Sequence, residues 1–157
     1  MKFFRYFPVV LLSLILFLYI VIDKKISVDI SPSITILNES LSNLSSNNIS
    51  NLNPNDFKKI SIDINVSASK FLYKDIIFEY DDLYDIISDT SVLKKISDSS
   101  FYFPNDLKLE TSIIVFAPKV DNKYILDSIK DFKLLLMWTD IYNNKHTKVY
   151  YLKDFIN

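Results

Sequence analysis

The densest group of chemically capable side chains is a run of acids between Asp75 and Asp89. Its six members are Asp75, Glu79, Asp81, Asp82, Asp85 and Asp89. Carboxylate oxygens are the ligands that calcium prefers, but the spacing and the glycine of an EF-hand loop are absent. Acids are also favoured at the N-terminus of a helix by the helix dipole. We therefore interpret the run as the start of a helix and predict no metal site, with a calcium-binding extracytoplasmic loop as the alternative.

His146 is the only histidine in the chain, and it lies between Lys145 and Lys148 beside a predicted turn. We expect it to be an exposed turn residue and not a general base. Two acids that face each other across a cleft could hydrolyse a glycosidic bond. The chain has 19 acids, so some pair of this kind is inevitable and carries no weight. We predict no catalytic or cofactor-binding residue, no cofactor and no enzymatic activity, and keep a tethered carboxylate-dependent hydrolase as an alternative.

Aromatic side chains are abundant, at 15% of the chain. They could form an exposed platform for a sugar, a peptide or another subunit, but we expect most of them to fill the core of a sheet protein. The run Phe101-Tyr102-Phe103 is the exception. Neighbouring side chains of a strand point to opposite faces. At least one of these three rings therefore lies at an edge, in a loop or on a contact surface.

The composition excludes several classes of site. The chain has no glycine and no cysteine. Phosphate-binding loops, dinucleotide-binding turns and nucleophile elbows all need glycine, and cysteine-ligated zinc and disulfides need cysteine. Beyond residue 25 there are 18 acidic and 14 basic side chains, which is no footprint for nucleic acid. Without glycine, we expect backbone positions with positive φ to be occupied by Asn or Asp.

Residues 1–25 have the pattern of a membrane anchor. Phe7–Ile22 carries no charge, and basic residues flank it at Lys2, Arg5, Lys24 and Lys25. We predict an uncleaved signal anchor, a transmembrane helix that contacts the lipid bilayer through residues 3–22. No small-residue cleavage site follows Ile22; a secreted domain released by signal-peptide cleavage is the alternative. The next basic residue after Lys25 is Lys58, which favours a cell-membrane protein with its C-terminal domain outside.

The chain after the anchor divides by composition. Residues 26–56 combine a strand-like segment with a polar stretch of Ser, Asn and Leu, which we interpret as a flexible stalk. Residues 57–157 form a β-rich extracytoplasmic domain. Asn-x-Ser triplets begin at Asn38, Asn43, Asn48 and Asn65. They are glycan acceptors only in a eukaryotic secretory pathway, and we expect them to reflect the Asn- and Ser-rich composition.

Apolar residues alternate with polar ones through most of the remaining chain, which is the pattern of half-buried strands. We predict strands over residues 26–37, 60–68, 74–80 and 107–116. A final hairpin joins 132–142 to 146–152 through Asn143-Asn144-Lys145, with Asn144 at the left-handed position. Pro32 confines the first strand to a sheet edge or splits it. A helix is expected within 81–97. The fold class is mainly β: an antiparallel β-sandwich of immunoglobulin-like architecture with one short helix, preceded by the transmembrane helix.

These elements predict a single-pass membrane protein that displays a small β-sandwich outside the membrane. The domain would bind a protein partner or serve as a subunit of an envelope complex.

Overall fold

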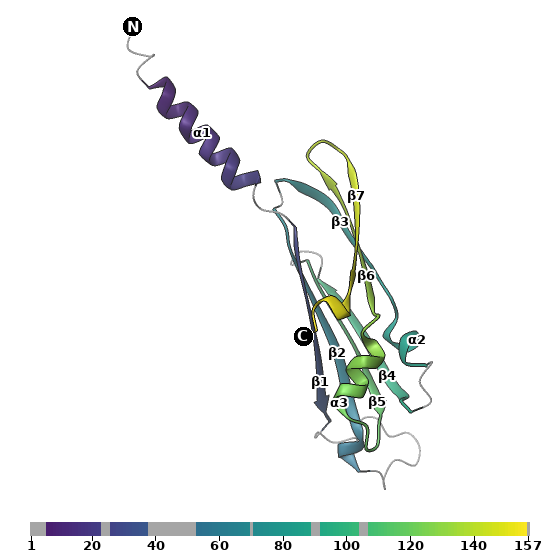
Figure 1. Cartoon of the computed structure of the whole chain (residues 1–157). Coiled ribbons are helices and arrows are strands. Elements are labelled where there is room, and N and C mark those ends of the chain that lie inside the picture. Colours follow the sequence, from purple (N-terminus) through teal and green to yellow (C-terminus); the bar gives the residue numbers. More distant parts are fainter. Residues whose placement is uncertain are drawn as a thin grey trace.

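The computed structural model, shown in Figure 1, describes residues 6–22, 26–37, 53–69, 71–88, 92–103 and 107–156. The strands are β1 (Ser27–Ile36), β2 (Phe57–Ser67), β3 (Tyr73–Tyr80), β4 (Lys94–Phe103), β5 (Lys108–Phe116), β6 (Lys133–Asp140) and β7 (Lys145–Tyr151). The helices are α1 (Phe7–Ile22), α2 (Leu83–Ser88) and α3 (Asn122–Ile129), with short 3-10 turns η3 (Pro54–Asp56) and η4 (Leu152–Asp154). The chain is mainly β, as predicted.

The strands form two antiparallel sheets. One sheet has the order β1-β2-β5-β4 and the other the order β3-β6-β7. Pro32 lies in β1, which is an edge strand, as its missing N–H requires. The predicted face-to-face sandwich is not confirmed.

Strand β1 pairs with β2 along its whole length, from Ser27 opposite Ser67 to Ile36 opposite Lys58. The Ser/Asn-rich segment therefore connects two paired strands. It does not separate the β-domain from α1, because only residues 23–25 lie between Ile22 and Ile26. The predicted stalk itself, with Asn38, Asn43 and Asn48, lies outside the described residues, whereas Asn65 is exposed on β2.

One hydrophobic core joins both sheets and two helices. Buried side chains of β2 and β5 pack in one cluster with Leu134 and Leu136 of β6, Leu83 of α2, and Ile125 and Ile129 of α3. In β2, Ile60, Ile62 and Ile64 are completely buried. The apolar residues of the period-two alternation that predicted this strand therefore lie on the face that packs into the core.

The helices differ from the prediction. The helix expected within 81–97 is wrong beyond Ser88, because β4 begins at Lys94. Within residues 81–97, the spacing that places apolar side chains on one face of a helix extends over Leu83, Ile86 and Ile87 but does not continue beyond them. Helix α3 was not predicted. Asp121 accepts a hydrogen bond from the Lys123 N–H at its N-terminus, 3.3 Å, as an N-cap residue does.

Within the described part of the chain, positive φ occurs at Asp75 (53°), Leu107 (50°), Lys119 (59°) and Asn143 (64°). The expectation of Asn or Asp is confirmed at two of them and wrong at Leu107 and Lys119. Lys119 follows Pro118 in a turn closed by the bond from Val120 N–H to the Ala117 carbonyl, 3.3 Å. A type II turn needs positive φ at this position. The Leu107 side chain packs against the core, which holds its backbone in place.

Helix α1 differs from the other elements in the exposure of its side chains. Its described side chains, from Tyr6 to Phe17, are all exposed. Among the described residues, no helix combines the length and the apolar character needed to cross a bilayer. The transmembrane helix predicted within residues 1–25 is therefore not confirmed. The 16 residues of α1 extend over about 24 Å, against a hydrocarbon core of about 30 Å.

Candidate functional site

A pocket of about 470 Å³ opens at the end of the β-domain nearest α1. It lies between the start of β3, the turn between β6 and β7, and Ile26, four residues after the end of α1. Its aromatic lining is Tyr73, Trp138, Tyr142 and Tyr150. Its ionisable lining is Asp140, His146 and Lys148. The remaining lining residues are the aliphatic Ile26, Leu72 and Ile141.

Strand pairing brings these segments together. Tyr73 lies opposite Asp140 and Lys74 opposite Thr139, so the turn that leads into β3 sits beside the turn that leaves β6. The Lys74 Nζ atom donates a hydrogen bond to Asn143 Oδ1 across the two turns, 2.7 Å. The register of β3 and β6 shifts after Lys74, and Asp75 at this irregularity has a positive φ, as one residue of a β-bulge often does.

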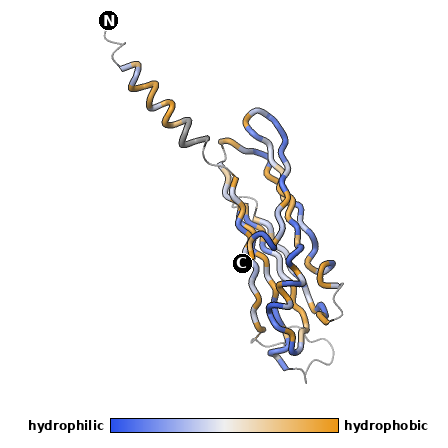
Figure 2. The backbone as a smooth tube through the Cα atoms, viewed as in Figure 1, coloured by the Kyte–Doolittle hydropathy of each residue, from blue (hydrophilic) through white to orange (hydrophobic). Residues whose placement is uncertain are grey.

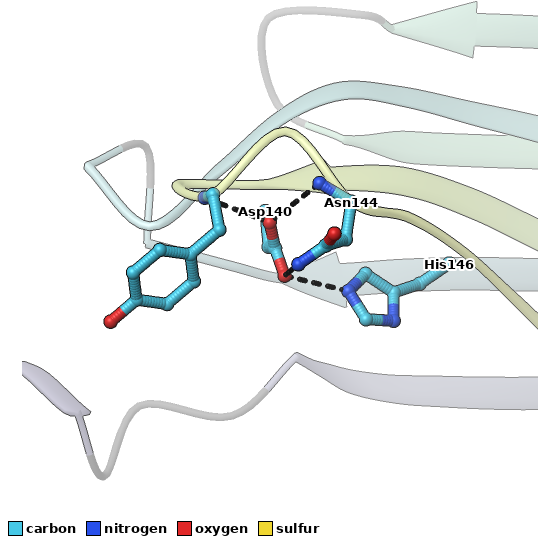
Figure 3. A network of polar contacts seen from close by, with 4 residues as sticks. Asp140, Asn144 and His146 are labelled. Atoms are coloured by element: carbon cyan, nitrogen blue, oxygen red, sulfur yellow. Dashed lines mark hydrogen bonds and ion pairs between the residues drawn. The ribbon is translucent and has the colours of Figure 1, made fainter.

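Asp140 is the centre of the hydrogen bonds in this turn (Figure 3). Its carboxylate accepts from the N–H groups of Tyr142 at 2.8 Å and Asn144 at 2.9 Å. The Asn144 side-chain amide donates at 3.2 Å, and His146 Nε2 lies 2.8 Å from Oδ2. A carboxylate that receives several donors is held in one orientation and stabilised in its charged form. The bond to His146 is the largest of the causes that lower the pKa of Asp140 to about 2.

His146 lies within β7, and the expectation of a turn residue is wrong. The turn is 141–144, and Asn143, not Asn144, occupies its left-handed position. His146 faces Trp138 across the strand pair, and the two rings stack with centroids 5.4 Å apart and planes 15° apart. The imidazole side chain is 43% exposed and that of Asp140 is 18% exposed. His146 is therefore exposed, as predicted, but fixed between a carboxylate and an indole.

We expect the Asp140 contacts to give the fold a specific acid sensitivity. A carboxyl pKa lowered from 3.8 to about 2 contributes stability that is complete above pH 4 and is lost as the pH falls through 2. The urea midpoint of Asp140→Asn should therefore lie below that of the wild type at pH 5. The two midpoints should converge between pH 4 and pH 2. His146→Phe keeps a ring against Trp138 and removes the main hydrogen-bond donor to Asp140. It should therefore lower the urea midpoint at pH 5 by the larger part of the difference between the wild type and Asp140→Asn. An unchanged difference at pH 2 would contradict this assignment.

Two members of the acidic run between Asp75 and Asp89 make structural contacts. Asp82 Oδ1 accepts from the Tyr84 N–H at 2.8 Å at the start of α2, and Asp81 Oδ2 accepts from the Lys133 N–H at 3.1 Å. These two acids cap a helix and join two segments, which agrees with the interpretation as a helix start. No three His, Cys, Asp or Glu side chains among the described residues are placed to hold a metal ion. Asp89 lies outside the described residues.

The aromatic residues divide between the core and the surface. Phe101, Tyr102 and Phe103 are 57%, 47% and 42% exposed on β4, an edge strand of its sheet. The prediction that this run lies partly at an edge is confirmed. Most aromatic residues were expected in the core, whereas Trp138 is half-buried and lines the pocket.

The lining of the pocket is rich in aromatic rings. Asp140 and His146 form an acid–imidazole pair in the lining of this pocket. The pocket offers four amphipathic rings and the Lys148 ammonium, which lies 4.6 Å from the centroid of the Tyr150 ring. Aromatic rings with a few polar groups are typical of binding sites.

Asp140 and Trp138 were not predicted to line a site. The sequence does contain one signal for this site. Asp140 and His146 lie on either side of residues 141–144, and a turn of that length brings their side chains together. No protein-family model, curated protein or solved structure matches this chain in the comparisons made.

Proposed function

We propose that the protein is anchored in a lipid bilayer by residues 3–22, displays its β-domain on the outer side of the cell membrane, and works by binding. The binding surface is the end of the domain nearest α1, where the pocket opens, and its occupant is a component of the cell envelope, either a protein partner in an envelope complex or the membrane surface itself. The observation that carries the proposal is the apolar surface of α1, whose described side chains are all exposed.

An uncovered apolar helix needs an apolar environment. Figure 2 shows hydrophobic residues along much of α1, and the sequence of this helix contains no charged residue. A helix that is apolar all round is buried in a core or in a membrane, and the described side chains of α1 are not buried in this domain. Phe3, Phe4 and Tyr6 can extend the apolar length, and local thinning of the bilayer accommodates a short span at modest cost.

The strand order supports an immunoglobulin-like sandwich as the displayed module. In chain order the strands pair as 1-2-5-4 and 3-6-7, which is the arrangement A-B-E-D and C-F-G of constant-type immunoglobulin domains. Buried residues of both sheets belong to one core. Such modules present loops at the two ends of the sandwich, and the pocket lies at one of these ends.

Thiol labelling in intact cells tests the anchoring and its orientation, because the chain has no native cysteine. Lys123 is exposed on α3, and Lys123→Cys should react with a membrane-impermeant maleimide in intact cells. The matched control Lys2→Cys, on the basic flank before the span, should react only after the cells are broken. Reaction of position 123 only after lysis would reverse the orientation. A mature chain that lacks residues 1–25 would support the secreted alternative and overturn the anchor.

A further inference from the structure

Two neighbouring turns at the α1 end of the domain carry exposed apolar side chains. Phe71 is 90% exposed, Tyr142 is 77% exposed and Ile141 is 54% exposed; we call these three residues the tip cluster. Phe71 and Ile141 line one shallow hollow of about 170 Å³, so the two turns present a joint surface. In Figure 2 the turn that leads into β3 is coloured as hydrophobic.

The chain keeps this surface close to the end of α1. Ile26 lines the pocket together with Tyr142 and Ile141. The four peptide units between Ile22 and Ile26 can span at most about 14 Å. If α1 lies in the hydrocarbon core, the headgroup layer above it is about 5–8 Å thick. The pocket end of the domain is therefore tethered within reach of the headgroups, with no spacer to hold it away.

The chemistry around the tip cluster is that of a membrane interface. Tyrosine and tryptophan are enriched at this depth because their rings are apolar and their tips are polar. Tyr73, Trp138, Tyr142 and Tyr150 line the pocket beside the tip cluster. Lys74 and Lys148 lie at the same end, and long amines can reach phosphate groups while their stems contact apolar surface.

We propose that the tip cluster docks on the interfacial region of the bilayer in which α1 is anchored, so that Phe71, Ile141 and Tyr142 contact lipid. This inference rests on the proposed membrane anchoring and names the occupant of the pocket end of the domain. In Figure 1, α3 lies toward the end of the domain away from α1, so docking of the tip cluster would hold α3 away from the lipid surface.

Tryptophan fluorescence in reconstituted vesicles tests the docking. Trp138 is the only tryptophan, so Phe71→Trp combined with Trp138→Phe places a single indole in the tip cluster. The full chain is reconstituted in phosphatidylcholine vesicles, with or without a nitroxide on the lipid headgroup. We expect the emission maximum of this indole to lie at a shorter wavelength than that of an indole in water. Its intensity should fall about twofold when the lipid carries the nitroxide, because an indole at the interface contacts the labelled headgroups.

The matched control carries the indole at the opposite end of the domain. Tyr124 is 44% exposed on α3, and Tyr124→Trp with Trp138→Phe should show no quenching. Co-flotation of the protein with the vesicles is measured in the same samples. A chain that does not float overturns the proposed anchoring. A chain that floats while the indole at position 71 stays as unquenched as that at position 124 overturns the docking alone.

A second pair of variants retains Trp138, so the result does not depend on whether the fold tolerates the Trp138→Phe substitution. Phe71→Cys and Tyr124→Cys each provide a single thiol for an environment-sensitive fluorophore. Vesicles should increase the emission of the fluorophore at position 71 and leave the emission of the fluorophore at position 124 unchanged. Equal changes at the two positions would contradict the docking.

Discussion

Replacing Leu12 and Ile15 by lysine is expected to move the protein from the membrane fraction to the aqueous fraction. Both side chains lie near the middle of α1 and are exposed, 69% and 56%. Each lysine near the centre of a spanning helix costs about 2.5–3.5 kcal/mol of insertion free energy. Two of them together should lower the membrane partition by about a thousandfold or more, since 1.4 kcal/mol is a factor of ten.

Flotation of membranes from gently broken cells, with no detergent added, measures this change. The control is the double variant Leu12→Phe and Ile15→Phe, which changes both side chains but keeps the helix apolar and should stay with the membranes. Retention of the lysine variant in the membrane fraction would show that α1 is not the anchor. Recovery of the wild-type chain from the aqueous fraction would remove the basis of the proposed function.

Phe132→Ala is expected to remove a large part of the stability of the β-domain. The Phe132 side chain is completely buried, and its ring centroid lies 6.5 Å from that of Tyr80. Its N–H donates to the Ile129 carbonyl at the end of α3, and its carbonyl accepts from the Leu152 N–H, both at 2.9 Å. A buried Phe→Ala change costs about 3–5 kcal/mol, whereas a domain of this kind is stable by about 5–15 kcal/mol.

Urea unfolding of the full chain in a mild non-ionic detergent, followed by Trp138 fluorescence, measures the loss. Phe71→Ala is the matched control: Phe71 is 90% exposed, so the same substitution there should change the free energy of unfolding by at most about 0.5 kcal/mol. A loss below about 1 kcal/mol for Phe132→Ala would mean that the core around α3 and β6 is loosely packed.

Much of the sheet could be predicted because buried strands leave a strict period of two. The alternation of Ile60, Ile62 and Ile64 with polar residues predicted a half-buried strand, and the structure places all three in the core. Pro32 similarly predicted an edge strand. Helix α3 was missed although Asp121 and the spacing of Ile125 and Ile129 are helix signals, because its eight residues give little periodicity to detect. Which strands share a sheet depends on contacts distant in sequence, and no local pattern states it.

The candidate site was missed because it depends on the length of one turn. The predicted hairpin, with Asn143-Asn144-Lys145 as its loop, pairs Tyr142 with His146 and therefore Trp138 with Tyr150. In the structure the turn is longer on the β6 side, and Trp138 pairs with His146. Hairpin register is set by turn geometry, and the Asp140 carboxylate closes this turn through two backbone N–H groups. Without the register, the ring stack and the hydrogen bond between His146 and Asp140 could not be foreseen.

The full-length pairing of β1 with β2 also makes the chain suitable for carrying a reporter. Strand β1 starts near α1 and has ten residues, so its far end lies about 33 Å away from that start. The segment between Leu37 and Asn53 is attached at this remote end, where the Leu37 N–H donates to the Phe57 carbonyl. Loop-closure entropy grows slowly, by about 0.6 kcal/mol for each doubling of loop length. An epitope tag spliced into this segment should thus be tolerated and remain accessible to antibodies on living cells, away from the lipid surface.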